Sequence, residues 1–204
     1  MFITLEGGEG AGKSTQARML ADALIGAGFA VLVTREPGGA PGAETLRALL
    51  LDGAHDWSAP AETYLHFAAR AEHLARTIQP ALARSEVVIC DRFADSTMAY
   101  QGDGQGAARA LVASLTSLLP VMPDLTLVLD VSPAAAARRL LARPQRLDRY
   151  ERMDAGFHAR VRAGFLRIAA AEPGRCVIID ADADLDVVHR AIRQAVALRL
   201  DGFA

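Results

Sequence analysis

Lys13 is the only lysine among the 22 lysine and arginine residues of this chain, and the residues around it could bind phosphate. Residues 7–14 fit the pattern G-x-x-x-x-G-K-[ST] at every defined position. In such a loop, backbone N–H groups and the lysine ammonium hold nucleotide phosphates, and the final hydroxyl binds Mg²⁺. We therefore predict a nucleotide-phosphate site made of Gly7, Gly8, Glu9, Gly10, Ala11, Gly12, Lys13, Ser14 and Thr15.

This loop requires a strand before it and a helix after it, and the sequence supplies both. The apolar run 2–6 is typical of a buried strand. After the loop, apolar residues recur at positions 17, 20, 21, 24 and 25, the spacing of one face of a helix predicted at about 14–26. The glycines therefore indicate a phosphate-binding loop rather than a turn that only packs.

Further apolar runs alternate with helical patterns along the chain. Strands are predicted at 30–34, 87–91, 125–130 and 176–180. Helices are predicted at about 43–52, 60–84 with a break near Pro80, 106–119, 133–142, 154–171 and 184–200. The strands are apolar on both faces, which is typical of a parallel sheet covered by helices, so we predict one α/β domain over residues 1–204.

Three of the predicted strands end in aspartate, and one of these residues is a candidate metal ligand. A phosphate-binding loop works with a carboxylate near Mg²⁺, at a strand end beside the loop. Asp130 and Asp180 lead into a helix start or an acidic turn, whereas Asp91 precedes Arg92 and a polar cluster. We therefore expect Asp91, together with Ser14, to bind the metal.

Phosphoryl transfer also needs an acceptor, and three places in the chain could bind one. Residues 34–39 follow the second predicted strand, residues 66–70 lie in a helix, and Asp91-Arg92 ends the third strand. Arginine side chains fork onto phosphate oxygens. Phe67 and Arg70 are three residues apart and so share one helix face, where a ring could stack on a base. The pattern indicates a nucleotide acceptor.

Residues 138–152 carry six arginines and contain Pro144, which interrupts the helix predicted there. Such a segment could close over the transferring phosphate and supply cations to the transition state. No Ser-His-Asp set and no general base is evident in the sequence. A phosphate monoester acceptor has a second pKa of about 6 and is already ionised at pH 7, so it needs only positioning and charge neutralisation.

The composition argues against several other classes of protein. The net charge is −2 and no basic stripe with interleaved aromatic residues is present, so we expect no nucleic-acid partner. No apolar run of 18 residues and no signal peptide is evident, so we expect no membrane partner. Cys90 and Cys176 lie in apolar runs and are expected to be reduced thiols, as in a cytoplasmic enzyme.

Four parts of the sequence together resemble the bacterial thymidylate kinases (dTMP kinases). They are residues 2–16, 34–39, 88–93 with 96–102, and 147–151, which lie in order within residues 2 to about 167. The resemblance implies a P-loop NTPase fold of the nucleoside-monophosphate-kinase type, with a five-stranded parallel sheet and a basic lid at about 138–153. It also implies a homodimer that uses ATP and Mg²⁺ to convert dTMP to dTDP for dTTP synthesis.

The resemblance further implies which residues contact the phosphates. Lys13 and the lid residue Arg149 reach the transferring phosphates, and Arg143 of the lid belongs to the ATP site. The loop 7–14 contains no arginine, which matches the family members whose catalytic arginine lies in the lid. Arg92, together with Arg47, holds the acceptor phosphate.

The same resemblance assigns the sugar and base contacts. Glu9 approaches the 3′-hydroxyl of dTMP, and Arg70 hydrogen-bonds the thymine. Thr97 and Tyr100 line the deoxyribose and base pocket, and Tyr100 disfavours a 2′-hydroxyl. The other residues assigned to the substrate site are Glu36, Pro37, His66, Phe67 and Gln101.

One position departs from the family pattern. The family places a stacking phenylalanine four residues before the base-reading arginine, and here that residue is His66. Phe67 lies three residues before Arg70, so either ring could stack on the base. Two other functions stay open at this point. One is a kinase for another nucleoside monophosphate or for a nucleoside, and the other is a P-loop switch protein whose bound nucleotide controls its binding to a partner.

Overall fold

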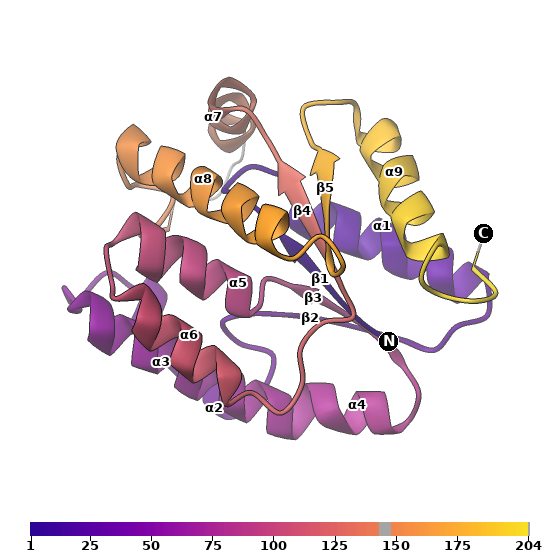
Figure 1. Ribbon diagram of the computed structural model, residues 1–204, viewed down its shortest axis with the longest axis horizontal. Helices are drawn as coiled ribbons and strands as arrows, with labels where there is room; N and C mark the ends of the chain where they lie inside the picture. Colours follow the sequence, from indigo (N-terminus) through magenta and orange to yellow (C-terminus); the bar gives the residue numbers. More distant parts are fainter. Residues whose placement is uncertain (143–147, 204) are drawn as a thin grey trace.

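Residues 1–142 and 148–203, which the computed structural model describes, fold around a parallel sheet of five strands (Figure 1). The strand order is β2-β3-β1-β4-β5, with every neighbouring pair parallel. The carboxyl ends of the strands therefore meet at one edge of the sheet. The strands are β1 (Phe2–Glu6), β2 (Val31–Arg35), β3 (Val87–Asp91), β4 (Leu125–Asp130) and β5 (Cys176–Asp180).

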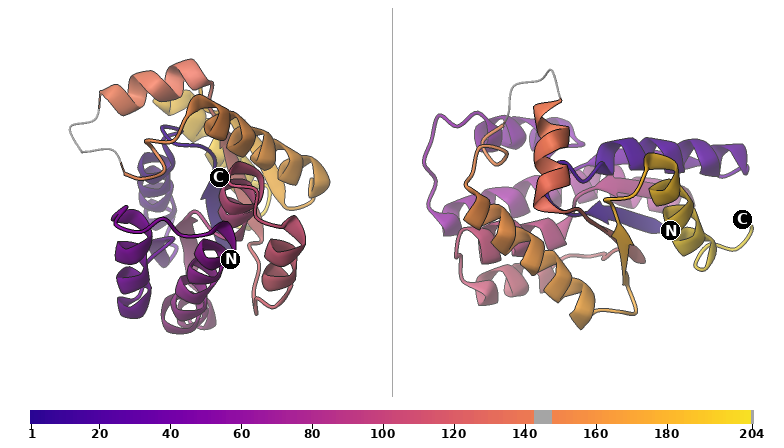
Figure 2. Two further views of the ribbon diagram at one scale, coloured as in Figure 1. Left: turned by 90° about the vertical axis from the view of Figure 1, so that its left-hand side faces the viewer. Right: turned by 90° about the horizontal axis from the view of Figure 1, so that it is seen from above.

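Helices cover both faces of this sheet (Figure 2). One face packs against α1 (Lys13–Gly26) and α9 (Leu185–Ala197). Helix α7 (Pro133–Leu141) follows β4 and leads toward the undescribed residues 143–147. The other helices are α2 (Pro41–Leu51), α3 (Ala59–His73), the π-helical turn η1 (Leu74–Ile78), α4 (Gln79–Ala83), α5 (Ala94–Thr97), the π-helix η2 (Met98–Gly104), α6 (Arg109–Ser117) and α8 (Ala155–Ala171).

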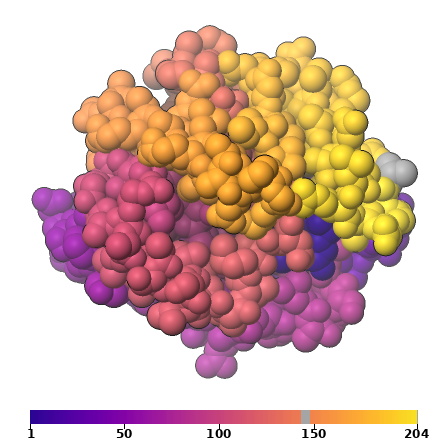
Figure 3. All heavy atoms as spheres, in the orientation of Figure 1, coloured from indigo at the N-terminus to yellow at the C-terminus, as the bar shows by residue number. Residues whose placement is uncertain are grey.

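Side chains of β1 alternate between two hydrophobic layers. Ile3 and Leu5 are fully buried in the layer under α1 and α9. Phe2 faces the opposite layer, where its ring contacts Phe93 edge to face at a centroid distance of 5.1 Å. Burial on both faces explains the nearly continuous apolar sequence of this central strand. On the second face, α8 packs against η2 and adjoins it at the molecular surface (Figure 3).

The helix predicted at 60–84 is continuous but irregular, and its irregularity lies before Pro80 rather than at it. Helix α3 passes into the π-helical turn at 74–78, and α4 then begins with Pro80 in its first turn. Proline lacks an N–H and fits the first turn of a helix, so the chain makes its adjustment in the preceding turn.

The sequence interpretation missed the short helix α5 and the π-helix η2. No apolar stripe marks them, because their buried side chains include the polar residues Asp95, Ser96, Thr97 and Gln101. Both cysteines are free and buried. Across the described residues, no helix combines the length and apolar character needed to cross a membrane.

Candidate active site

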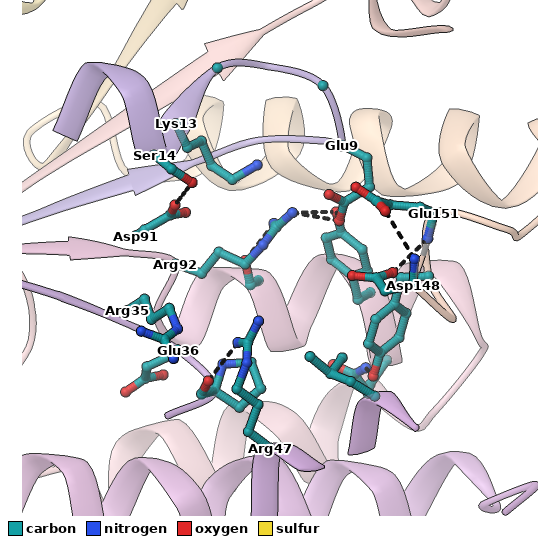
Figure 4. A pocket seen from close by; sticks show the side chains of 18 residues that line it. Glu9, Lys13, Ser14, Arg35, Glu36, Arg47, Asp91, Arg92, Asp148 and Glu151 are labelled. Carbon is teal, nitrogen blue, oxygen red and sulfur yellow. Dashed lines mark hydrogen bonds and ion pairs between the residues drawn. The ribbon is translucent and has the colours of Figure 1, made fainter. Parts of the chain in front are cut away.

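A cavity of about 220 Å³ opens at the carboxyl end of the sheet, beside the loop that follows β1 (Figure 4). Its walls come from this loop, from the ends of β2 and β3, from α2 and η2, and from Asp148, Tyr150 and Glu151. Lys13 and Arg92 both extend into the cavity. The parallel sheet thus gathers side chains that are far apart in the sequence.

The loop conformation depends on its glycines. Gly7 has φ 132°, and a Cβ there would lie 2.4 Å from the carbonyl oxygen of Leu129. Gly10 has φ 73°, and a Cβ would meet the carbonyl oxygen of Ala136 at 2.8 Å. Larger residues would push the loop away from β4 and α7, so these two glycines fix the path of the backbone.

The ammonium of Lys13 lies within this loop. Its Nζ donates to the carbonyl oxygens of Gly7 and Gly8, at 3.1 and 2.8 Å. Burial, assisted by the nearby guanidinium of Arg92, lowers the pKa of Lys13 from 10.5 to about 8. Of the other loop residues, Ala11 packs in the core, and Thr15 is exposed on the first turn of α1.

The structure brings together the two residues expected to bind Mg²⁺. Ser14 at the start of α1 donates from Oγ to Oδ2 of Asp91 at 2.5 Å, across the space between the ends of β1 and β3. A hydroxyl and a carboxylate are oxygen ligands of the kind Mg²⁺ prefers, and both residues line the cavity, so the pair fits this ion.

Arg92 is held at the cavity floor by several acceptors. Its guanidinium donates to the carbonyl oxygen of Gly7 at 2.9 Å, to Oε1 of Glu9 at 2.6 Å and to Ser96 Oγ at 3.2 Å. It also contacts Tyr100, both at the hydroxyl (2.9 Å) and over the ring (4.8 Å to the centroid). The φ of Arg92 is 72°, an uncommon conformation for a residue with a side chain.

Glu9 stays ionised in this environment. Burial acts to raise its pKa, but the charges of Arg92 and Lys13 and the hydrogen bond from Tyr100 outweigh burial and lower the pKa to about 2. The loop therefore presents a carboxylate beside two cations. Such a carboxylate can accept a hydrogen bond from a hydroxyl of a bound sugar.

Arg70 is buried behind the cavity rather than on its surface, with only 2% of the residue exposed. Its Nε donates to Glu36 at 2.7 Å, and its Nη2 donates to Thr97 Oγ1 at 3.0 Å. Its guanidinium lies over the ring of Phe67, 4.7 Å from the centroid. Among the described residues, Nη1 of Arg70 has no hydrogen-bond partner, and neither has Oε1 of Gln101, which lines the cavity.

His66, the departure from the family pattern, is buried and neutral. Burial, with the charge of Arg70 nearby, lowers its pKa from 6.5 to about 3. Its Nε2 lies 2.9 Å from the hydroxyl of Tyr150. The ring thus links α3 to the segment that follows the undescribed residues.

The remaining predicted residues lie at the rim or in the lid. Arg47 lines the cavity and donates to the carbonyl oxygen of Pro37 at 2.7 Å. Arg149 donates to Glu62 at 2.5 Å. Arg139 on α7 donates to the carbonyl oxygen of Gly10 at 3.3 Å. Arg143, Pro144 and Arg146 lie outside the described residues, so the predicted lid is described only at 138–142 and 148–153.

Sequence reasoning missed several residues of the site. Asp148 lines the cavity, and Glu62 is a fully buried carboxylate that accepts from the lid. Ser96 accepts a hydrogen bond from Arg92, and Glu6 bonds both Ser96 and the backbone N–H that follows Arg92. A charged residue inside an apolar run, as Glu6 is at the end of the first strand, is the one signal that could have indicated such a role.

The chain has clear relatives among known proteins. Residues 5–192 match the family model described as thymidylate kinase. The thymidylate kinase of Caulobacter vibrioides is 54% identical over 202 residues, covering 98% of this chain and 97% of the relative. That of Gluconobacter oxydans is 54% identical over 200 residues, covering 96% and 94% of the two chains.

A solved structure has the same fold. The crystal structure of thymidylate kinase from Ehrlichia chaffeensis superposes with a TM-score of 0.78 at 37% identity, covering 96% of this chain and 97% of that one. The predicted fold, a five-stranded parallel sheet of the P-loop nucleoside-monophosphate-kinase type, is therefore confirmed.

Proposed function

Since this chain belongs to the thymidylate kinase family, we propose that it transfers the terminal phosphoryl group of ATP to dTMP, forming dTDP for dTTP synthesis. Family membership makes it an enzyme and removes the alternative of a switch protein. The structural observation that carries the proposal is that Lys13 and Arg92 extend into one cavity (Figure 4). Two cations on adjoining walls suit a donor phosphate and an acceptor phosphate placed in line.

On the donor side, Lys13 and the backbone N–H groups of residues 7–15 would hold the ATP phosphates, and Ser14 and Asp91 would hold Mg²⁺. The metal, when bound, would neutralise charge on the phosphate oxygens. Among the residues that the structure describes, Nζ of Lys13 is bonded only to carbonyl oxygens of its own loop. Phosphate oxygens can replace those acceptors without a change of fold. Arg143 is assigned to the same site.

On the acceptor side, Arg92 would bind the phosphate of dTMP, with Arg47 at the rim. The fixed geometry of Arg92 supports this role, because a guanidinium already held by Gly7 and Glu9 loses little freedom when it binds an anion. The acceptor phosphate is already ionised near neutral pH, so the site needs no general base.

Base recognition would fall to Arg70 and Gln101. The unpartnered Nη1 of Arg70 is a donor and the unpartnered Oε1 of Gln101 is an acceptor. Thymine offers an O4 acceptor beside an N3–H donor, whereas cytosine offers the reverse pair. The buried atoms therefore favour thymine, since cytosine would leave both unsatisfied. His66 or Phe67 would supply the ring beneath the base.

Around the sugar, Glu9 would accept from the 3′-hydroxyl, and Tyr100 would leave no room for a 2′-hydroxyl. The hydrogen bond between Tyr100 and Glu9, at 2.7 Å, supports a shared wall of this kind. Thr97 would act indirectly, because its hydroxyl accepts a hydrogen bond from Arg70 and so helps to position that side chain. Glu36 and Pro37 complete this wall, since both line the cavity.

We further propose that residues 1–204 act as one domain, that the enzyme is a homodimer, and that it works in the cytoplasm. The free, buried thiols of Cys90 and Cys176 suit a reducing compartment. Sedimentation equilibrium tests the dimer, since a single monomeric species would exclude it.

A panel of acceptors tests the function. ADP release would be measured with ATP, Mg²⁺ and dTMP, dUMP, dCMP, AMP or thymidine in turn. We expect turnover to be fastest with dTMP and negligible with thymidine, which lacks the phosphate that Arg92 binds. Failure to form dTDP from dTMP would refute the proposal, and faster turnover with another monophosphate would reassign the substrate.

A further inference from the structure

Glu6 is a fully buried carboxyl group outside the cavity that the reaction proposed above does not use. It ends β1, directly before the phosphate-binding loop. Its Oε1 accepts from the backbone N–H of Phe93 at 2.7 Å, and its Oε2 is 2.5 Å from Oγ of Ser96. Both contacts reach the segment that follows β3. Burial of a carboxyl group costs free energy of folding, so we expect these two hydrogen bonds to have a function that offsets this cost.

The first contact fixes an unusual turn. Arg92 has φ 72°, which costs free energy in a residue that has a Cβ. The N–H of Arg92 donates to the carbonyl oxygen of Leu5 at 3.0 Å, and the next N–H, of Phe93, donates to Glu6. Two successive amides are thus held by the end of β1, which keeps the Arg92 side chain directed into the cavity.

The second contact reaches the guanidinium itself. Oγ of Ser96 lies between Oε2 of Glu6 and Nη1 of Arg92, at 2.5 and 3.2 Å. Burial, with the nearby charge of Asp95, raises the pKa of Glu6 to about 8. In either protonation state one oxygen can accept from Phe93 while the other shares a hydrogen with Ser96, so the arrangement does not depend on ionisation.

We propose that Glu6 is a positioning residue for the acceptor phosphate: it fixes the turn at Arg92 through Phe93, and the Arg92 guanidinium through Ser96. The inference rests on the proposed role of Arg92 in binding dTMP. Glu6 does not line the cavity, so it would contact neither nucleotide. Its loss should therefore weaken the use of dTMP and leave the ATP site intact, since Lys13 and Ser14 do not depend on these bonds.

Glu6→Leu tests this by removing both bonds at similar volume, and Glu6→Gln keeps an acceptor for Phe93 and a partner for Ser96. We expect the KM for dTMP to rise about tenfold or more in Glu6→Leu, with the KM for ATP within about twofold, and Glu6→Gln to recover most of the loss. Asp124→Ala is the matched control. It removes the carboxylate that accepts from the N–H of Phe2, at 2.7 Å, at the opposite end of β1.

A change in stability alone, or an equal change in both KM values, would overturn the inference. If Glu6→Leu does not fold, Ser96→Ala decides: a raised KM for dTMP that Ser96→Thr restores supports the proposal, and an unchanged KM refutes it. A wild-type enzyme without activity on dTMP would refute the function itself. An active wild type with an unaffected Glu6→Leu variant would refute only the role of Glu6.

Discussion

Arg149 donates a 2.5 Å hydrogen bond to Oε2 of Glu62, so the candidate catalytic arginine of the lid rests on helix α3 in this structure. Oε1 of the same carboxylate accepts from Gln101, Gln105 and Tyr150, at 2.7 to 2.9 Å. Within the described part of the chain, Arg149 is the only donor to Oε2. Release of Arg149 toward phosphate would thus leave Glu62 bound on one oxygen.

This relationship leads to a first prediction for Arg149→Ala. The arginine would contact the transferring phosphoryl group and not the base, so its loss should lower kcat about a hundredfold or more. The KM for dTMP should change by no more than about threefold. Steady-state kinetics with dTMP as the varied substrate gives both numbers.

Arg152→Ala is the control for Arg149→Ala, since it removes the same charge from an exposed position three residues away. It should keep wild-type kinetics. Normal turnover in Arg149→Ala would contradict the assignment of Arg149 and point to another lid arginine. An equal fall in both variants would show a general effect of lid charge instead of a specific role of Arg149.

A second prediction concerns base recognition. Arg70→Ala removes the buried donor that we assign to thymine and takes a hydrogen bond from Oε2 of Glu36 and from Oγ1 of Thr97. Glu36 keeps its contact with His73 through Oε1. We expect kcat/KM for dTMP to fall at least about a hundredfold, while the affinity for ATP stays within about twofold. Kinetics and ATP titration by calorimetry measure the two effects.

Arg76→Ala is the matched control for Arg70→Ala. Arg76 lies in η1, the continuation of α3, and is 71% exposed in an ion pair with Glu72. A surface pair of this kind contributes little, so the variant should behave as the wild type. An Arg70→Ala enzyme that loses ATP and dTMP binding equally would show a general structural role instead.

The sequence predicted the parts of the site that depend on local patterns. The loop around Lys13 has a defined spacing, and the apolar strands that flank it place Asp91 beside Ser14 at the same edge of the sheet. The sequence could not predict how Arg70 is oriented. Helical spacing put it on a face with Phe67, but only tertiary packing decides that it lies behind the cavity, bound to Glu36.

Buried polar residues were the hardest to foresee. Glu62 and Glu6 have no exposed surface, and each looks in the sequence like one more acidic residue at a helix start or a strand end. Their side-chain partners lie 39 to 90 positions away in the sequence, which is farther than any local pattern reaches. The π-helix η2 was missed because it mixes both kinds of buried residue: Gln101 is bonded to Glu62, while Ala99 and Tyr100 pack against α8.

A third prediction concerns Lys13, the single lysine. Lys13→Arg should lower kcat about a hundredfold or more, nearly as much as Lys13→Met. A guanidinium is too large and too planar to take the position between the carbonyl oxygens of Gly7 and Gly8 that the ammonium occupies. An active Lys13→Arg enzyme would mean that charge alone suffices. Arg18→Lys, an exposed change on α1, serves as the control and should be silent.

A fourth prediction concerns His66 and the dependence of stability on pH. Burial and the charge of Arg70 lower the pKa of His66 to about 3 in the folded chain, although Glu62 acts in the opposite direction. In the unfolded chain the pKa is near 6.5. Between these values only the unfolded state binds the proton, so the free energy of unfolding decreases as the pH falls from about 6.5 toward 3.

Phenylalanine cannot take up this proton. When the pH falls from 7.5 to 5, we therefore expect the free energy of unfolding of His66→Phe to decrease by about 2 kcal/mol less than that of the wild type. Urea unfolding at both pH values measures the difference. Tyr150 keeps a partner in the variant, because its hydroxyl also donates to Glu62 at 2.7 Å. His55→Asn removes an exposed histidine and should leave the pH dependence as it is. If the stability of His66→Phe and of the wild type depended on pH in the same way, the pKa of His66 would not be lowered in the folded enzyme.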